Sequence, residues 1–169
     1  LAKDYDYYQV SGISISPDNK KMAFGVDTLS RRIYTIKVKD LGTGKMYPDK
    51  IHGVNSYTTW ASDSKTMFYT GKDEQTLRSD KIFRHTLGES QDDDTLVYEE
   101  KDETFSTYVY PSKSREYIMI GSTSTMATEY RFLSSKTPLE SFKVLQKRER
   151  GLESVSYTIS EPTRPERIS

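Results

Sequence analysis

Hydrophobic and polar residues alternate along several short stretches of the chain. In residues 31–38, for example, Tyr34, Ile36 and Val38 occupy every second position. A period of two is typical of a strand that buries one face. No segment shows the apolar spacing of i, i+3, i+4 and i+7 that indicates an amphipathic helix. The pattern therefore predicts an all-β protein.

The predicted strands fall into three groups of four, separated by polar turns. The first group is 13–15, 22–26, 31–38 and a strand that begins at 46–47; the second is 57–60, 66–71, 81–87 and 95–98; the third is 107–110, 117–121, 128–133 and 142–145. Turn residues occupy 40–45, 88–94 and 134–138.

A sequence repeat marks the same place in each group. Residues 16–24 read Ser-Pro-Asp-Asn-Lys-Lys-Met-Ala-Phe, and residues 61–69, which start 45 positions later, read Ala-Ser-Asp-Ser-Lys-Thr-Met-Phe-Tyr. A weaker third copy occupies 111–119. Repeats of ~40–50 residues with four strands each are typical of β-propeller blades. We therefore expect three four-stranded blades of a propeller, with a sandwich of about twelve strands as the alternative.

The repeats also divide the chain. Residues 1–12 would be a lead-in or the end of a preceding blade, and 13–53, 54–103 and 104–150 would be the three blade-like modules. In residues 151–169, a further strand at 154–159 would precede an irregular tail with two prolines. A closed ring typically needs ~4–8 blades, so three would form a partial ring whose open blades can self-associate. Because the chain begins at Leu1 without Met, we expect a processed chain or a fragment.

Composition excludes several functional classes. The 25 basic and 25 acidic residues cancel, so we expect no nucleic-acid partner and no attraction to a membrane surface. No apolar run approaches the ~18 residues of a membrane span. The absence of Cys excludes disulfides and thiolate metal sites. It fits a reducing compartment, so we expect a cytoplasmic location, with the bacterial periplasm as the alternative.

Catalytic and cofactor-binding motifs are absent from the sequence. The stretch 121–125, Gly-Ser-Thr-Ser-Thr, lacks the second Gly of a Gly-x-Ser-x-Gly nucleophile turn, so we interpret it as a polar loop. The two histidines, His52 and His85, show no metal-ligand spacing and are expected to be structural or solvated. Since no phosphate-binding or dinucleotide-binding loop occurs either, we expect no catalytic, metal or cofactor-binding residue and no cofactor.

Two charged stretches and the single Trp have simple structural interpretations. The acidic turn around Asp92, Asp93 and Asp94 lacks the Gly and the spaced ligands of a calcium loop. We expect a solvated hairpin loop there, with an acidic rim for basic peptides as the alternative. The basic stretch 143–150 is interrupted by Glu149 and favours a polar edge strand and turn. Trp60 is expected to pack in the core.

Two longer stretches resemble a known family. The first runs from Ser14 to Gly42 and contains Ser-Pro-Asp-Asn at 16–19 and Asp-Thr-Leu-Ser-Arg-Arg-Ile-Tyr-Thr-Ile at 27–36. The second comprises Trp60, Thr-Met-Phe-Tyr at 66–69, Lys-Asp-Glu-Gln-Thr-Leu-Arg at 72–78 and Leu-Val-Tyr-Glu-Glu-Lys-Asp at 96–102. Both are similar to the β-propeller of the oligopeptidase B (protease II) group in the prolyl oligopeptidase family of serine peptidases. The resemblance covers residues 2–151.

This resemblance implies that the chain would act together with a catalytic domain. The family joins a seven-bladed propeller to an α/β-hydrolase domain with a Ser, Asp and His triad, and the oligopeptidase B group cleaves short peptides after Lys or Arg. The propeller covers the active site and excludes folded proteins. This chain would be about three of the seven blades and would carry none of the catalytic residues. The alternative is a protein-interaction propeller scaffold without peptidase activity.

Overall fold

The computed structural model describes residues 3–149, which form strands and a single turn of 3-10 helix. The strands are β1 (Gln9–Ile15), β2 (Lys21–Asp27), β3 (Tyr34–Asp40), β4 (Met46–Trp60), β5 (Thr66–Lys72), β6 (Ser79–Thr86), β7 (Thr95–Glu99), β8 (Ser106–Pro111), β9 (Tyr117–Thr123), β10 (Thr128–Ser134) and β11 (Lys143–Gln146). The helix η1 (Gln91–Asp93) precedes β7. The predicted all-β class is confirmed. The strand expected at 154–159 lies outside the described residues.

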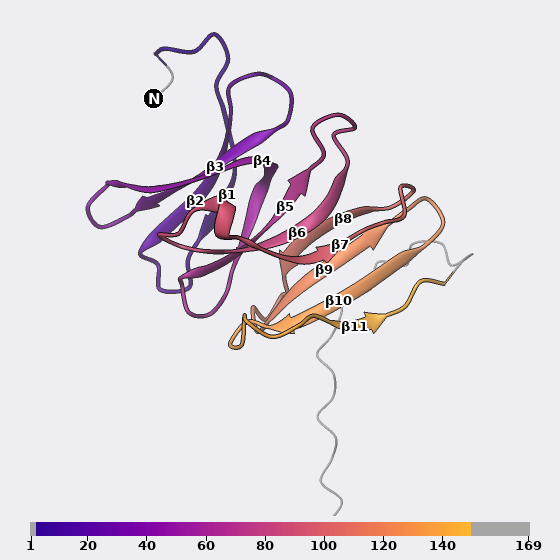
Figure 1. Ribbon diagram of the computed structural model, residues 1–169. Coiled ribbons are helices and arrows are strands. Elements are labelled where there is room, and N and C mark those ends of the chain that lie inside the picture. Colours follow the sequence, from indigo (N-terminus) through magenta and orange to yellow (C-terminus); the bar gives the residue numbers. More distant parts are fainter. Residues whose placement is uncertain (1–2, 150–169) are drawn as a thin grey trace, which may run out of the picture.

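The strands form two antiparallel sheets (Figure 1). One sheet has the order β1-β2-β3-β4-β5-β6-β7, and the other has the order β11-β10-β9-β8. The 15-residue strand β4 belongs to two units, because it pairs with β3 up to Val54 and with β5 from Val54 to Trp60. We call β1–β3 with the first part of β4 blade 1, the rest of β4 with β5–β7 blade 2, and β8–β11 blade 3. The ring is open.

The first strand starts earlier than its apolar residues suggested. β1 begins at Gln9, within the segment 1–12 that the sequence pattern placed ahead of the first module. The register between β1 and β2 shifts between Ser11 and Ser14, which interrupts the simple alternation. Gly12 lies in this shift with φ of +66°, and a Cβ atom there would lie 2.0 Å from the backbone oxygen of Ser56 on β4. Only glycine allows this close approach of β1 and β4.

Two apolar clusters lie between the blades. The cluster between blades 1 and 2 contains Ala23, Ile36, Val38, Ile51, Val54, Trp60, Met67 and Tyr69. The cluster that joins blade 2 to blade 3 contains Ala61, Phe68, Ile82, Val109, Ile118, Ile120 and Leu133. Met67 and Phe68 are neighbours on β5 that point to opposite clusters, which is why β5 is buried on both faces. Trp60 packs in the core, as predicted.

The repeat turns join successive blades as well as successive strands. The backbone N–H of Asp18 donates to Ser64 Oγ at 3.0 Å, and Lys21 Nζ donates to the Ser64 carbonyl oxygen at 3.0 Å. Turn hydrogen bonds place Ser16, Ala61 and Ser112 at equivalent positions, so the third copy starts one residue later than the sequence comparison suggested. The fourth residue of each turn has a positive φ, at Asn19, Ser64 and Arg115.

Candidate functional site

Ser122, from the stretch that was expected to be a polar loop, and His52 lie apart and have different partners. Ser122 is buried on β9 rather than in a loop, and its Oγ lies 3.0 Å from the Tyr98 hydroxyl oxygen and 3.2 Å from Thr107 Oγ1. His52 is exposed on β4, with its Nδ1 3.0 Å from Thr35 Oγ1. The partners of these side chains are therefore those of structural polar groups.

His85, in contrast, is the centre of a buried ionic network. Its ring is 1% exposed, with Nε2 2.8 Å from Asp49 Oδ1 and Nδ1 2.6 Å from Asp94 Oδ1. Asp49 is on the blade 1 part of β4, whereas His85 is on β6 and Asp94 follows η1, both in blade 2. Tyr69 donates its hydroxyl to Asp94 Oδ2 at 2.7 Å, and the Gly88 backbone N–H donates to Asp49 Oδ1 at 2.6 Å. The network thus crosses the interface between blades 1 and 2.

The two carboxylates favour the charged form of the His85 ring. Burial alone would lower the pKa of His85, but the hydrogen bonds and charges of Asp94 and Asp49 outweigh it and raise the pKa above 6.5. Both ring nitrogens face carboxylate oxygens, so both can donate only when the ring is an imidazolium. Burial, followed by the bond to Asp94, raises the pKa of Tyr69, which keeps its hydroxyl protonated as a donor.

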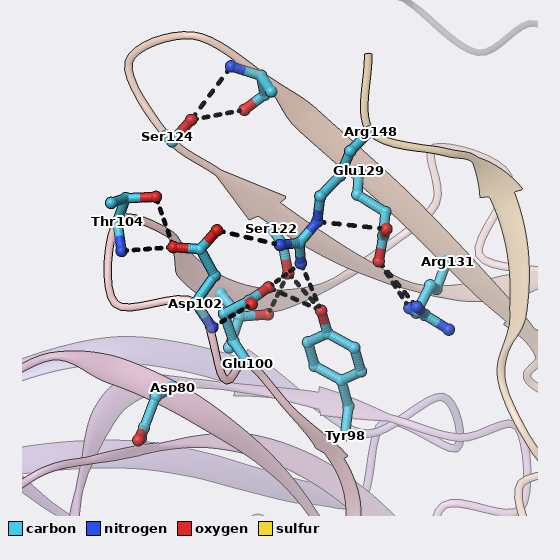
Figure 2. Close-up of polar contacts among 12 residues, drawn as sticks. Asp80, Tyr98, Glu100, Asp102, Thr104, Ser122, Ser124, Glu129, Arg131 and Arg148 are labelled. Carbon is cyan, nitrogen blue, oxygen red and sulfur yellow. Dashed lines mark hydrogen bonds and ion pairs between the residues drawn. The ribbon is translucent and has the colours of Figure 1, made fainter. Parts of the chain in front are cut away.

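A second network gathers acidic side chains around Arg148 (Figure 2). The guanidinium donates to the buried carboxylate of Glu100, its Nε lies 3.4 Å from Glu129 Oε2, and its Nη1 lies 3.8 Å from Asp102 Oδ2. The Phe105 ring lies against the guanidinium, with its centroid 4.0 Å from Arg148 Cζ. The carboxylates pair with the edge of the Arg148 guanidinium, and the aromatic ring covers its face.

Tyr98 connects the Arg148 network to blade 2. Its hydroxyl donates to Glu100 Oε2 at 2.8 Å and accepts a hydrogen bond from Ser122 on blade 3. Arg131 stacks over the Tyr98 ring, with Cζ 4.9 Å from the centroid, and also pairs with Glu129 at 2.8 Å. Because Tyr98 lies on β7 while Ser122 and Arg131 belong to blade 3, this network joins blades 2 and 3.

The electrostatics of Glu100 and Arg148 match this pairing. Burial would raise the pKa of Glu100, but the Asp102 backbone N–H, the Tyr98 hydroxyl and Arg148 together lower it. Burial would likewise lower the pKa of Arg148, and its contacts with Glu100 and Glu129 raise it instead. Both groups are therefore charged over the whole neutral range. Their opposite charges compensate each other within the interface.

The structure separates the members of each charged stretch. In the acidic turn, Asp92 and Asp93 are exposed, while Asp94 turns inward to His85. In the basic stretch, Lys147 is exposed, while Arg148 points to the acidic residues of the second network. The predictions of a solvated loop and of a polar edge strand are therefore correct for most of these residues. The exceptions are Asp94, which belongs to the His85 network, and Arg148, which belongs to the second network.

The sequence analysis did not identify the partners in the His85 network, although the strand pattern indicated that two of its residues, Asp49 and His85, are buried. Asp49 lies at alternate positions with Tyr47 and Ile51, so the strand period places it on an apolar face. His85 lies in the same way between Phe83 and Leu87. A polar residue at a buried strand position needs a partner.

Within residues 3–149, no group of three His, Asp or Glu side chains is arranged to hold a metal ion, and no helix is long and apolar enough to span a membrane.

The comparisons with known proteins identify the family. Residues 1–161 match the family model described as the prolyl oligopeptidase N-terminal beta-propeller domain. The chain belongs to this propeller family. Dipeptidyl aminopeptidase BI of Pseudoxanthomonas mexicana is 38% identical over 153 residues, which are 90% of this chain and 21% of that protein. Protease 2 of Moraxella lacunata is 30% identical over 154 residues, which are 90% of this chain and 22% of that protein.

Solved propellers of the family have the same fold. Oligopeptidase B from Leishmania major aligns with a TM-score of 0.83 and 29% identity, over 89% of this chain and 21% of that chain. Oligopeptidase B from Trypanosoma brucei, solved with covalently bound antipain, aligns with a TM-score of 0.80 and 25% identity over the same shares. The resemblance to oligopeptidase B is therefore confirmed, and the chain spans about a fifth of the relatives' length.

Proposed function

We propose that this chain is the non-catalytic propeller part of a serine oligopeptidase, where it controls access of substrate to a hydrolase domain of the same parent protein. The observation that carries the proposal is the family match over residues 1–161, combined with a blade set that leaves the ring open. An open set of blades needs further blades to cover its end faces. A hydrolase domain in the same parent would supply the nucleophile and base.

The proposed mechanism is steric. Blades held together by apolar clusters and ionic networks form a rigid wall, and a wall beside a catalytic domain admits short, flexible peptides while it excludes folded proteins. The parent would cleave after Lys or Arg, in line with the similarity to proteins named protease 2 and oligopeptidase B. A cytoplasmic location, with the bacterial periplasm as the alternative, belongs to the same proposal.

The experiment compares the full-length parent with the 169-residue chain. Both receive three fluorogenic peptides that differ only at the cleaved position, which holds Arg, Lys or the neutral lysine isostere norleucine. We expect the parent to cleave the Arg and Lys peptides, with inhibition by a serine-reactive reagent, and the 169-residue chain to cleave none. Equal cleavage of the norleucine peptide would contradict the basic specificity. An inactive parent would favour a protein-interaction scaffold instead.

The gating role has its own test in the parent. The Arg-containing sequence is presented once as a short free peptide and once within a loop of a stable folded protein. A gate predicts cleavage of the free peptide and no cleavage of the loop until the carrier protein is unfolded. Cleavage of the folded carrier at the same rate as the free peptide would contradict the proposed gate, whatever the specificity.

A further inference from the structure

The interface between blades 1 and 2 contains a group that can change charge near neutral pH. His85 has an ordinary pKa of 6.5, in the range where small changes of environment alter its charge. It is one of only two histidines in the chain, and the other, His52, is exposed. Of the two histidines, only His85 is therefore buried at this interface.

The geometry around His85 requires two donors from the ring. Asp49 Oδ1 lies 2.8 Å from Nε2 and Asp94 Oδ1 lies 2.6 Å from Nδ1, and an ionised carboxylate can only accept. The side chains of both aspartates are at most 2% exposed. A neutral ring would leave one bare nitrogen facing a buried carboxylate oxygen, where two acceptors repel each other and water has no access.

The other groups around the ring reinforce this requirement. On β5, Tyr69 donates to Asp94 and carries no charge, and on the β6–β7 loop Gly88 donates its backbone N–H to Asp49. Asp49 Oδ2 is buried without a hydrogen-bond partner among the described residues, and the cation paired with this carboxylate, through Oδ1, is His85. The charged groups in contact with the ring are thus Asp49 from blade 1 and Asp94 from blade 2.

We propose that His85 is a proton-operated latch between blades 1 and 2, closed when the imidazolium bridges Asp49 and Asp94 and loosened when the ring nitrogen Nε2 releases its proton to solvent. Of the two ring bonds, only the one from Nε2 to Asp49 crosses the interface. Because Asp94 sits on the same blade as His85, loss of the other bond would not part the blades. The device rests on the fold alone and holds whether or not the parent is a peptidase.

The sign of the effect follows from the direction of the pKa change. The pKa of His85 is raised in the folded state, so its stabilising contribution is complete below 6.5 and is lost as the pH rises through the folded-state pKa. The latch therefore loosens toward alkaline pH. If opening returns His85 to its ordinary pKa, the opening equilibrium changes about tenfold for each pH unit by which the folded-state pKa exceeds 6.5.

Hydrogen exchange in the 169-residue chain can test the latch through two adjacent amides. The Gly88 N–H bonds across the interface to Asp49, whereas the Leu87 N–H bonds within blade 2 to the Lys65 carbonyl oxygen at 2.9 Å. We expect the protection factor of Gly88 to fall as the pH rises through the His85 titration, while that of Leu87 stays constant. Parallel behaviour of the two amides would overturn the proposal.

Two further measurements keep the test decisive. His85→Gln should remove the pH dependence of Gly88 protection, and the matched variant His52→Gln should retain it. Should His85→Gln fail to fold, nitrogen NMR of the histidine-labelled wild-type chain gives the ring state directly. An imidazolium with both ring N–H groups protected at pH 6, below the ordinary pKa of 6.5, supports the latch, and a neutral ring at that pH overturns it.

Discussion

Asp49 Oδ1 lies 2.8 Å from His85 Nε2, although the two residues are 36 positions apart and belong to different blades. The contact lies beside the apolar cluster that contains Ile51 and Met67. Burial of apolar side chains brings the blades together without fixing their mutual position. The Asp49–His85 pair adds a buried, directional contact across this interface.

Loss of the Asp49 charge should destabilise the protein strongly. Asp49→Asn removes the negative partner of His85 and places an amide against the Gly88 N–H, so we expect a loss of about 3–5 kcal/mol in the free energy of unfolding. Urea denaturation of the 169-residue chain measures it. The control is Asp92→Asn, an exposed position in the acidic turn, which should change stability by less than about 0.5 kcal/mol. Equal effects of the two variants would contradict the role of the network.

Removal of the Arg148 guanidinium should weaken the interface between blades 2 and 3. Arg148→Ala leaves the buried Glu100 carboxylate without its cation, and because the Arg148 side chain is 30% exposed, water replaces part of the lost contact. We expect a loss of about 2 kcal/mol in the free energy of unfolding. Lys147→Ala, the exposed neighbour, serves as the control and should be nearly neutral. A neutral Arg148→Ala would mean that the blades hold together without this pair.

Glu100 should contribute to the acid sensitivity of the chain. Its pKa is lowered in the folded state, so its stabilising contribution is present above its ordinary value of 4.5 and is lost as the pH falls through the folded-state pKa. Glu100→Gln should therefore be less stable than wild type at pH 6, and the difference should shrink as the pH falls below 4.5. Thermal unfolding at a series of pH values measures both curves, and a constant difference would refute the assignment.

Replacement of Gly12 should destabilise the protein more than replacement of Gly53, because Gly12 has both a positive φ and a close neighbour. Gly12 and Gly53 both have positive φ, at +66° and +73°, but a Cβ at Gly12 would collide with Ser56, whereas Gly53 has open space. Gly53→Ala should cost about 1 kcal/mol, the effect of the backbone conformation alone. Gly12→Ala should cost clearly more, measured by the same urea denaturation. Similar losses would show that β1 can move away from β4.

The open faces of the end blades should cause association. On blade 3, Val109 points toward blade 2, so the stacked rings of Tyr108 and Tyr110 point to the other face, where no strand of the described residues covers them. Sedimentation velocity of the 169-residue chain should show oligomers that increase with concentration, and Tyr108→Lys should shift them toward monomer. Tyr57→Lys on blade 2 is the control. A monomer at all concentrations would contradict the expectation.

Local sequence was enough to predict most of the strands and turns. The alternation of Tyr34, Ile36 and Val38 reflects a period that each strand carries in its own residues, and the Pro17 and Asn19 turn recurs because each blade needs the same tight connection. The family resemblance followed from the same stretches. These features depend on neighbours within a few positions, so no knowledge of the assembled fold is required.

The tertiary structure decided how the strands are shared and which polar groups meet. A hydrophobic period shows that the face holding Asp49 and Ile51 is buried, but not what it is buried against. Asp49 pairs with His85, and Glu100 with Arg148, across blade boundaries, and each meeting depends on the twist and stacking of whole sheets. Sequence therefore determined the blades, and only their packing determined the ionic networks that join them.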